Sequence, residues 1–337
     1  MKYKYEVECE RNDSHAKYIV LKGLDEPCRQ LVIPDSIEVL ESDVNGEASA
    51  EEVQSNDGKA SVSLPVKIIG NHAFSSRKDL EEVIIPSSVH TILGFAFHNC
   101  GRLRRIQLTD SVNEYLDGST RQCESLEEID VTLEHENYYV VRRILEDNDR
   151  RLRFRLHLSD GEAVLVFPGF NYDFVENTMA RTIQFAIEGT GYAYRECVKS
   201  DNINFREYDS FFTKVSADDS VIAEMIAVSR LQYPYELAED AKTQYRDWLF
   251  KNAKKNLIRA VRSLGNKGKG VTDTNSELSG VVTDLVSYYI NEKLIPDGDT
   301  SAIIAEAAEF DRTELVSMLM EYQSGNEKQD NFLELDI

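Results

Sequence analysis

The chain has 337 residues and lacks several features that would define its class at once. No apolar run approaches the roughly 18 residues that a membrane helix needs, so we expect no membrane-spanning segment. The five cysteines are odd in number and scattered, which predicts reduced thiols rather than a disulfide framework. The opening residues, MKYKYEVECE, contain no apolar signal core. We therefore expect a cytoplasmic protein.

Positive charge is also scarce. The chain has 38 Lys and Arg against 60 Asp and Glu, for a net charge of −22. Residues 1–135 hold 14 basic and 25 acidic residues and the remainder 24 and 35, so each half carries −11. Because nucleic acid and anionic lipid must have their phosphates neutralised, we expect neither as a partner.

Catalytic and cofactor motifs are missing as well. The six histidines show no spacing typical of metal ligands, so we predict no metal and no cofactor. Gly189–Gly191 lacks the third glycine of a dinucleotide site and is interpreted as a hairpin turn, and Gly265–Gly270 is interpreted as a surface loop. His98 and Cys100 lie two residues apart without a carboxylate to orient the histidine, which favours turn residues over a catalytic pair. No catalytic residue is predicted.

What the chain does contain is a 23-residue repeat. Leu80–Ile85 recurs as Leu103–Leu108 and as Leu126–Val131, each with the pattern Leu-x-x-apolar-x-apolar. This is the strand segment of a leucine-rich repeat, whose units must stack to bury their apolar side chains. Side chains alternate along a strand, so Val83 and Ile85 and their equivalents point inward. The outward positions form the candidate partner-binding face: Glu82, Ile84, Arg105, Gln107, Glu128 and Asp130.

The same spacing relates residues outside the strands. Ala73-Phe74 recurs as Ala96-Phe97, and Cys100 recurs as Cys123. Stacked repeats bring equivalent residues to about 5 Å, which would geometrically allow a Cys100–Cys123 disulfide. We favour two small buried thiols packed in a ladder. In the third copy Ser119-Thr120 replaces Ala-Phe, as expected at the end of a repeat array.

An earlier copy of the repeat is interrupted by an acidic insert. Cys28–Ile37 matches Leu80–Val89 at a distance of 52 residues, which is two periods plus six. The extra length falls in residues 41–59, which contain six acidic residues and one lysine. Such a segment cannot bury enough apolar surface to offset its ordering entropy. We predict a disordered acidic loop.

The phrases IPDSI, IIGNHAF, IIPSSV and ILGFAFHNC resemble the BspA-type leucine-rich repeat of bacterial proteins. The resemblance covers about residues 15–132. It implies a right-handed solenoid that binds proteins or surfaces, and members of this family are often secreted or exposed on the cell surface.

After Val131 the period disappears and β-strand patterns follow. Strands are predicted over Tyr138–Ile144, Arg151–Leu158, Glu162–Phe167, Thr182–Glu188 and Tyr192–Val198, with hairpin turns at Asp160-Gly161 and Gly189–Gly191. We expect a small antiparallel sheet that covers the open end of the solenoid or packs beside it. One strand carries a basic face that either binds an acidic partner or pairs with this acidic chain itself: Arg151, Arg153, Arg155 and His157.

The last third is predicted to be helical, over residues 221–231, 238–264, 277–293 and 301–322. Trp248, Leu249, Leu257, Val261 and Leu264 are predicted to face inward. A basic stripe follows the outer side of the second helix: Lys251, Lys255, Arg259 and Arg262. A solvated face is the simplest interpretation of this stripe. We also consider that either basic patch docks the acidic loop at residues 41–57 as an intramolecular latch.

A second resemblance lies near the C-terminus. Ala307–Met320 resembles the helical part of an ankyrin repeat, with Asp311 where that family has glycine. The resemblance implies an ankyrin-like helical pair. Residues 324–337 are acidic and are predicted to form a frayed tail.

The sequence therefore predicts an α+β protein. Its expected parts are a leucine-rich-repeat β-solenoid (1–135, with an acidic insert at about 41–59), an antiparallel β subdomain (136–209), an α-helical ankyrin-like subdomain (210–323) and an acidic tail (324–337). Repeat surfaces mostly present binding sites, so we predict a non-catalytic adaptor of the bacterial cytosol that binds a protein partner of unknown identity. The alternatives are a BspA-type surface adhesion protein and an enzyme with an unrecognised site in residues 136–264. The oligomeric state stays open.

Overall fold

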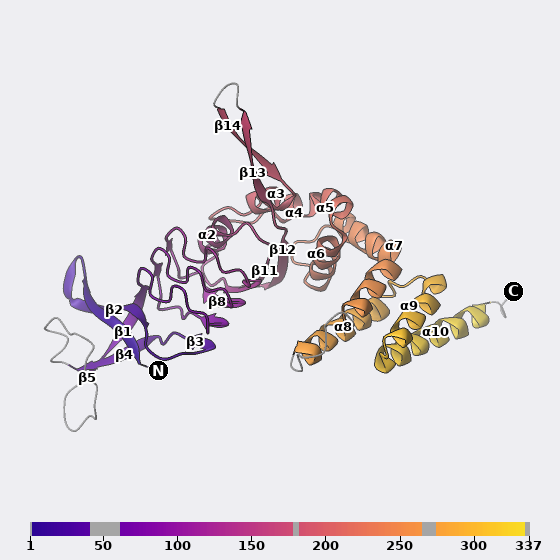
Figure 1. Cartoon of the computed structure of the whole chain (residues 1–337), viewed down its shortest axis with the longest axis horizontal. Coiled ribbons are helices and arrows are strands. Elements are labelled where there is room, and N and C mark those ends of the chain that lie inside the picture. Colours follow the sequence, from indigo (N-terminus) through magenta and orange to yellow (C-terminus); the bar gives the residue numbers. More distant parts are fainter. Residues whose placement is uncertain (1, 41–60, 178–181, 265–273, 334–337) are drawn as a thin grey trace. The chain divides into compact units, whose positions relative to one another are not determined.

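The structure, a computed structural model, describes residues 2–40, 61–177, 182–264 and 274–333 (Figure 1). The chain divides into two compact units. Unit 1 comprises Met1–Ile222 and Gln232–Leu237, and unit 2 comprises Ala223–Leu231 and Ala238–Ile337. The boundary predicted at 135/136 therefore falls inside unit 1. The acidic insert at 41–59 lies outside the described residues, so its predicted disorder and the latch stay hypotheses.

The repeats form a β-solenoid in which the predicted strands stack in one sheet. Its strand order is β12-β11-β10-β8-β6-β3. Strands β3, β6, β8 and β10 are parallel and in register, so that Val83 faces Ile106, which faces Ile129. These three side chains are at most 2% exposed, which confirms the predicted inward positions. The bounds are β3 (Gln30–Val32), β6 (Glu82–Ile84), β8 (Arg105–Thr109) and β10 (Glu128–Thr132).

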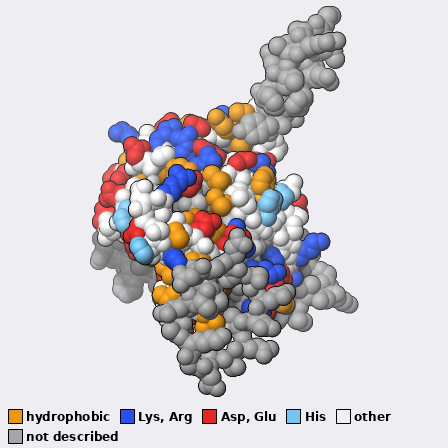
Figure 2. Space-filling model, turned by 90° about the vertical axis from the view of Figure 1, so that its left-hand side faces the viewer, with side chains coloured by type: hydrophobic (Ala, Val, Ile, Leu, Met, Phe, Trp, Pro, Cys, Tyr) orange, Lys and Arg blue, Asp and Glu red, His pale blue; other side chains and the backbone are white. Residues whose placement is uncertain are grey.

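A second sheet forms the other wall of the coil, in the order β1-β2-β5-β7-β9, with β4 paired to β5. Its short strands β7 and β9 come from the return segments of successive repeats, one period apart. On the face drawn in Figure 2, basic, acidic and hydrophobic side chains are interspersed. The bounds are β1 (Tyr3–Glu10), β2 (Asp13–Leu24), β4 (Ser36–Leu40), β5 (Ser61–Ile69), β7 (Thr91–Ile92) and β9 (Glu114–Tyr115).

The turns between the sheets repeat their backbone conformation every 23 residues. His72, Phe95 and Gly118 have φ of 54°, 58° and 75°. These values lie in the left-handed region, which residues other than glycine rarely adopt. The Phe74 and Phe97 rings stack at 5.5 Å between centroids. Stacking thus repeats the same strained turn in each unit.

Cys100 and Cys123 form the predicted ladder of buried thiols. The Cys100 Sγ donates to the Phe74 carbonyl and the Cys123 Sγ to the Phe97 carbonyl, each at 3.1 Å. All five cysteines are free. Each thiol therefore joins one repeat to the previous one without a covalent bond.

Beyond the last repeat, the strand predicted over Tyr138–Ile144 is wrong, because this segment begins helix α2 (Tyr139–Asp147). Its β-branched residues suggested a strand, but Val140, Val141, Ile144 and Leu145 recur at helical spacing and are all buried. Burial of one helical face against the solenoid outweighs the weak local preference for a strand.

The predicted hairpin that follows is confirmed and continues the solenoid sheet. Strand β11 (Leu152–Leu158) pairs parallel with β10, and β12 (Gly161–Phe167) pairs antiparallel with β11. The outer edge of β12 is covered at Val166, whose N–H donates to the Tyr208 Oη at 2.9 Å and whose carbonyl accepts from it at 2.7 Å. Tyr208 thus supplies the hydrogen bonds that a further strand would have made.

In the second predicted hairpin, the strand over Thr182–Glu188 is confirmed but its predicted partner strand is wrong. Strand β14 (Thr182–Glu188) pairs with β13 (Asn171–Asn177), and the two project from unit 1 as a long hairpin (Figure 1). The predicted strand over Tyr192–Val198 is instead helix α3 (Gly191–Glu196), so Gly189–Gly191 is not a hairpin turn. Helix formation points Arg195 inward, where its guanidinium donates to the carbonyls of Pro168 and Arg150 at 2.5 and 2.6 Å. These tertiary contacts have no local signature.

Unit 1 ends with short helices, and unit 2 is a helical array. The helices of the C-terminal region are α4 (Phe205–Ser210), α5 (Phe212–Asp218), α6 (Ser220–Gln232), α7 (Glu239–Ser263), α8 (Thr274–Asn291), α9 (Asp297–Glu309) and α10 (Thr313–Leu333). The predicted α6 and α7 are confirmed. Leu249, Leu257, Val261 and Leu264 are buried as expected, whereas Trp248 is half-buried.

The single helix predicted over residues 301–322 is wrong. It breaks between α9 and α10 at Asp311, which has φ of 55°. The predicted frayed tail is also corrected, because α10 continues to Leu333. The surface loop predicted at Gly265–Gly270 lies outside the described residues, and α8 begins at Thr274 rather than at the predicted 277.

Candidate functional site

The solenoid sheet brings the two predicted patches of unit 1 into one surface. Because β11 pairs parallel with β10, Arg153 lies beside Glu128 and Arg155 beside Asp130. Sequence spacing could not show this, since the step from β10 to β11 departs from the 23-residue period. We call the outward side chains of this sheet the strand face: Glu82, Ile84, Arg105, Gln107, Glu128, Asp130, Arg153, Arg155 and His157.

Asp130 lies at the centre of the strand face. Its side chain is only 7% exposed, although it was predicted as an open contact position. The Arg105 Nε donates to its Oδ2 at 2.7 Å, and the His157 Nε2 lies 3.5 Å from its Oδ1. A guanidinium that donates to a buried carboxylate is held more firmly than one in an exposed pair. This hydrogen bond raises the pKa of Arg105 above its ordinary value.

A row of alternating charge crosses the strands beside Asp130. Glu82 accepts from the Gln30 amide at 2.7 Å and lies 3.6 Å from the Arg105 guanidinium. In the same row Arg153 donates to Glu128 at 3.1 Å. Each pair of opposite charges on neighbouring strands contributes roughly 0.2–1 kcal/mol to stability. The row therefore orients its side chains more than it stabilises the fold.

Arg155 and His157 complete the surface at the β11 side. Arg155 donates to Glu162 at 2.6 Å, and its guanidinium lies 5.0 Å from the centroid of the Tyr233 ring. His157 lies 3.8 Å from the same Glu162. Arg151, which precedes β11, pairs with Glu127 at 3.1 Å. The basic face therefore pairs internally, as one of the two interpretations of the sequence had it.

The strand face is hollowed between β8 and β11. A depression of about 410 Å³ is lined by side chains of three strands, among them Gln107, Glu128 and Arg153. Gln107 is exposed and Glu128 and Arg153 are partly exposed. Both hydrogen-bond donors and acceptors therefore point into a shallow concave surface whose base is held by Asp130.

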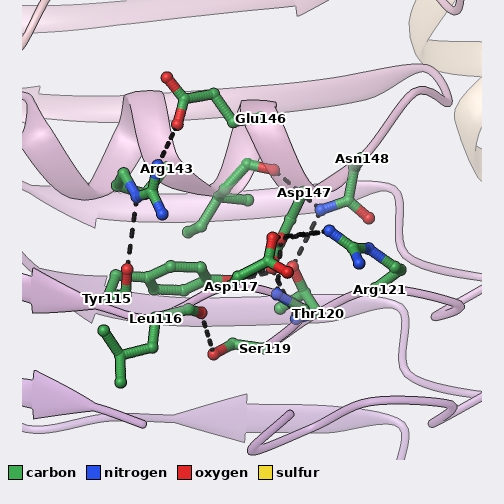
Figure 3. Close-up of polar contacts among 12 residues, drawn as sticks. Tyr115, Leu116, Asp117, Ser119, Thr120, Arg121, Arg143, Glu146, Asp147 and Asn148 are labelled. Atoms are coloured by element: carbon green, nitrogen blue, oxygen red, sulfur yellow. Dashed lines mark hydrogen bonds and ion pairs between the residues drawn. The ribbon is translucent and has the colours of Figure 1, made fainter. Parts of the chain in front are cut away.

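Sequence reasoning missed a second buried carboxylate, Asp147, at the end of α2. Figure 3 shows it among the turn residues of the third repeat, where it accepts from the Tyr115 hydroxyl at 3.1 Å and from the N–H of Gly118 at 2.9 Å and of Thr120 at 3.2 Å. Arg121 lies 3.7 Å away. Thr120 thus meets the polar end of α2, where its hydroxyl also accepts from the Asn148 amide at 2.9 Å, whereas the Ser119 hydroxyl donates to the carbonyls of Leu93 and Leu116. We therefore assign Asp147 a structural role at the end of the repeat array.

Asp110 has a similar structural role where the chain leaves the solenoid. It accepts from the N–H of His135 at 2.7 Å and of Asn137 at 3.2 Å. Burial acts to raise the pKa of Asp110, but these backbone donors hold it below its ordinary value. No signal in the sequence marks a carboxylate of this kind.

The third predicted patch lies on α7 in unit 2. Arg259 pairs with Glu224, and Arg262 donates to Glu306 at 2.6 Å. Lys251 and Lys255 are exposed on the same side of the helix. This stripe is thus confined to unit 2 and is separate from the strand face in its residues.

Cys197, the cysteine within residues 136–264, lacks the features of a reactive nucleophile. Cys197 is buried, and burial raises the pKa of its thiol to about 12, whereas a nucleophilic cysteine needs a lowered pKa. Among the described residues there is no group of three or more His, Cys, Asp or Glu that could hold a metal ion. No helix in the described parts of the chain is long and apolar enough to span a membrane.

Comparison with known proteins identifies the repeat. Residues 54–140 match the family described as BspA type Leucine rich repeat region (6 copies). The predicted resemblance is thereby confirmed for the repeats, and the ankyrin resemblance of residues 307–320 stays unconfirmed. Leucine-rich repeats of this type suggest protein interaction or surface adhesion. No curated protein matches the chain.

Solved structures similar to this chain are also leucine-rich repeat proteins. One from Bacteroides ovatus shares 22% identity over 37% of this chain and 30% of its own, with a TM-score of 0.25. One from Bacteroides capillosus shares 22% identity over 39% of this chain and 82% of its own, with a TM-score of 0.27. A leucine rich cell surface protein from Faecalibacterium prausnitzii shares 18% identity over 46% of this chain and 41% of its own, with a TM-score of 0.27. This chain thus spans less than a third of the first of these proteins.

Proposed function

We propose that this chain, with its BspA-type leucine-rich repeat region, is a non-catalytic scaffold that binds another protein through the strand face. The observation that carries the proposal is the buried Asp130 carboxylate, which holds Arg105 at 2.7 Å beneath a concave depression. Side chains held in place before binding lose less entropy when a partner arrives. Mixed charges favour specificity over tight apolar contact.

The contacts to the partner come from the exposed members of the face. Gln107 is exposed, and the side chain of Glu128 is 47% exposed. Both offer hydrogen bonds at the rim of the depression. Asp130 acts beneath them as a positioning residue, because its carboxylate is occupied by neighbouring side chains.

We further propose that the protein works in the bacterial cytoplasm. Cys100 and Cys123 occupy equivalent positions of successive repeats, and both are free thiols that donate to backbone carbonyls. Reduced thiols at such a position are typical of a reducing compartment. Labelling of intact cells with a membrane-impermeant reagent tests this: a tagged chain that is labelled before lysis supports the adhesion alternative.

The binding proposal is tested by affinity purification of the tagged full chain from its own cells, followed by mass spectrometry. The variant Glu128→Arg reverses a charge on the strand face. The matched control Asp117→Arg makes the same change on a repeat turn, where Asp117 is exposed and, like Glu128, pairs with an arginine. Circular dichroism shows whether both variants fold.

We expect a partner that wild type and Asp117→Arg recover and that Glu128→Arg loses. A partner retained by both variants would contradict binding through the strand face. Failure of wild type to recover any partner would contradict the scaffold proposal and direct attention to residues 136–264.

A further inference from the structure

A second charged surface follows α7 in unit 2. The helix and the start of α9 border a groove of about 770 Å³. In a chain of net charge −22, the charged residues that line this groove are five basic and one acidic: Lys251, Lys254, Lys255, Arg259, Arg262 and Asp299. The groove therefore reverses the sign of the protein's charge locally.

Three of these cations have carboxylate neighbours that fix their position. Arg259 pairs with Glu224, which is buried, and Arg262 donates to Glu306 at 2.6 and 3.1 Å. Lys254 lies 3.6 Å from Asp299. These pairs neutralise part of the charge and hold the walls of the groove in place.

Lys251 and Lys255 differ from the other three. Both are exposed, and they lie one helical turn apart, four residues along α7. Within the described residues neither takes part in a hydrogen bond or an ion pair. Two like charges at this spacing on a helix repel each other. Binding of an anion between them would relieve this repulsion.

The length of the basic stripe indicates a polymer rather than a small ion. From Lys251 to Arg262 the helix rises about 16 Å at roughly 1.5 Å per residue. One phosphate group meets only two or three of these side chains. An extended peptide, at about 3.3 Å per residue, would cover the same distance with about five residues.

The lining of the groove favours a peptide over a nucleic acid. Single-stranded nucleic acids are held by basic side chains together with aromatic rings on which the bases stack. Among the described residues, those that line this groove include no aromatic ring. They include one apolar side chain, Ile258, and two polar ones, Asn252 and Ser263. Asn252 and Ser263 donate to the carbonyls of Trp248 and Ala260 within α7, and their oxygens can still accept from a peptide N–H.

We propose that the α7 groove binds an Asp- and Glu-rich segment of a partner protein in an extended conformation. Lys251 and Lys255 make the principal ion pairs, and Arg262 and Lys254 flank them. This site is independent of the strand face, because every residue that lines it belongs to unit 2. The chain then carries two binding surfaces of different chemistry.

The test is fluorescence anisotropy with the full-length protein and a labelled peptide of about twelve residues, mostly glutamate separated by glycine and serine. We expect saturable binding at about 50 mM salt that weakens markedly at about 300 mM, because exposed charges are screened over a shorter distance. The variant Lys251→Glu/Lys255→Glu should lower the affinity about tenfold or more. A glutamine version of the peptide should not bind.

The matched control is Lys214→Glu/Lys242→Glu, which alters the net charge equally at two exposed or half-exposed helix positions outside the groove. It should retain binding to within about twofold. Equal loss in both double variants would mean non-specific attraction and would overturn the proposal. So would an absence of binding by wild type, or tighter binding of a labelled thymidine oligonucleotide than of the peptide.

Discussion

The Arg105 guanidinium donates to the Asp130 carboxylate at 2.7 Å across neighbouring strands, and the two side chains differ sharply in exposure, 43% against 7%. A buried anion therefore holds a cation that faces the solvent. This arrangement makes Asp130 a support for the strand face and leaves recognition to the residues around it.

Asp130→Asn should destabilise the protein by about 1–2 kcal/mol. The substitution removes the negative charge that accepts the hydrogen bond from Arg105 and that lies near Arg155 and His157. The partial exposure of the arginines keeps this below the cost of breaking a fully buried ion pair. Urea unfolding followed by circular dichroism measures the change. Glu82→Gln, 3.6 Å from the same guanidinium and 26% exposed, should cost less than about 0.5 kcal/mol. Equal losses would contradict the supporting role of Asp130.

Asp79 should make stability depend on acidity. The Arg77 guanidinium lowers its pKa from 3.8 to about 2, and the same carboxylate accepts from the Cys28 N–H at 2.7 Å. A lowered pKa in the folded state means that the ionised form stabilises the fold. That contribution is fully present above pH ~4 and is lost as the pH falls through about 2.

Comparison of wild type with Asp79→Asn therefore isolates this contribution. The difference in unfolding free energy should be on the order of 1 kcal/mol at pH 5, since the carboxylate is partly exposed and screened. It should shrink at about pH 2.5. In an Arg77→Gln background the same substitution should show little pH dependence. A difference that is constant with pH would refute the assignment.

Gly118 tests the repeated turn. Its φ is 75°, and a Cβ there would lie 2.6 Å from the Phe95 ring. Gly118→Ala should therefore destabilise by about 1–2 kcal/mol, through backbone strain and the displaced ring. Gly101→Ala is the control, because a Cβ added at Gly101 would meet no atom within 4 Å, and it should be neutral or slightly stabilising. Thermal unfolding measures both, and a neutral Gly118→Ala would show that the turn relaxes freely.

Tyr194 and Tyr208 are buried and pack edge to face, with ring centroids 4.7 Å apart. We expect their stability effects to differ when each loses its hydroxyl. Tyr208→Phe leaves the N–H and carbonyl of Val166 unpaired at the edge of β12 and should cost about 2–3 kcal/mol. The Tyr194 hydroxyl is buried without a hydrogen-bond partner among the described residues. Tyr194→Phe should therefore be neutral or stabilising. Similar losses in the two variants, measured by urea unfolding, would contradict the edge-covering role of Tyr208.

Much of unit 1 follows from local pattern. The 23-residue spacing predicts which residues form β6, β8 and β10, and alternation predicts that Val83 points inward and Glu82 outward. Both succeed because each repeat contacts mainly its neighbours, so that one unit's pattern is repeated by stacking. The strand predicted over Tyr138–Ile144 fails for the opposite reason. Its buried face depends on a surface that lies outside the segment.

Local sequence pattern was enough to predict the repeat, its strands, the direction of their side chains and the helical character of the last third. The pairing of β11 with β10, which merges two separate patches into the strand face, and the burial of Asp130 at its centre both depend on tertiary packing. Periodicity is a property of residues close along the chain, whereas burial and pairing depend on residues that folding brings together from a distance. The site therefore had to be seen in three dimensions, although its strands could be predicted from the sequence.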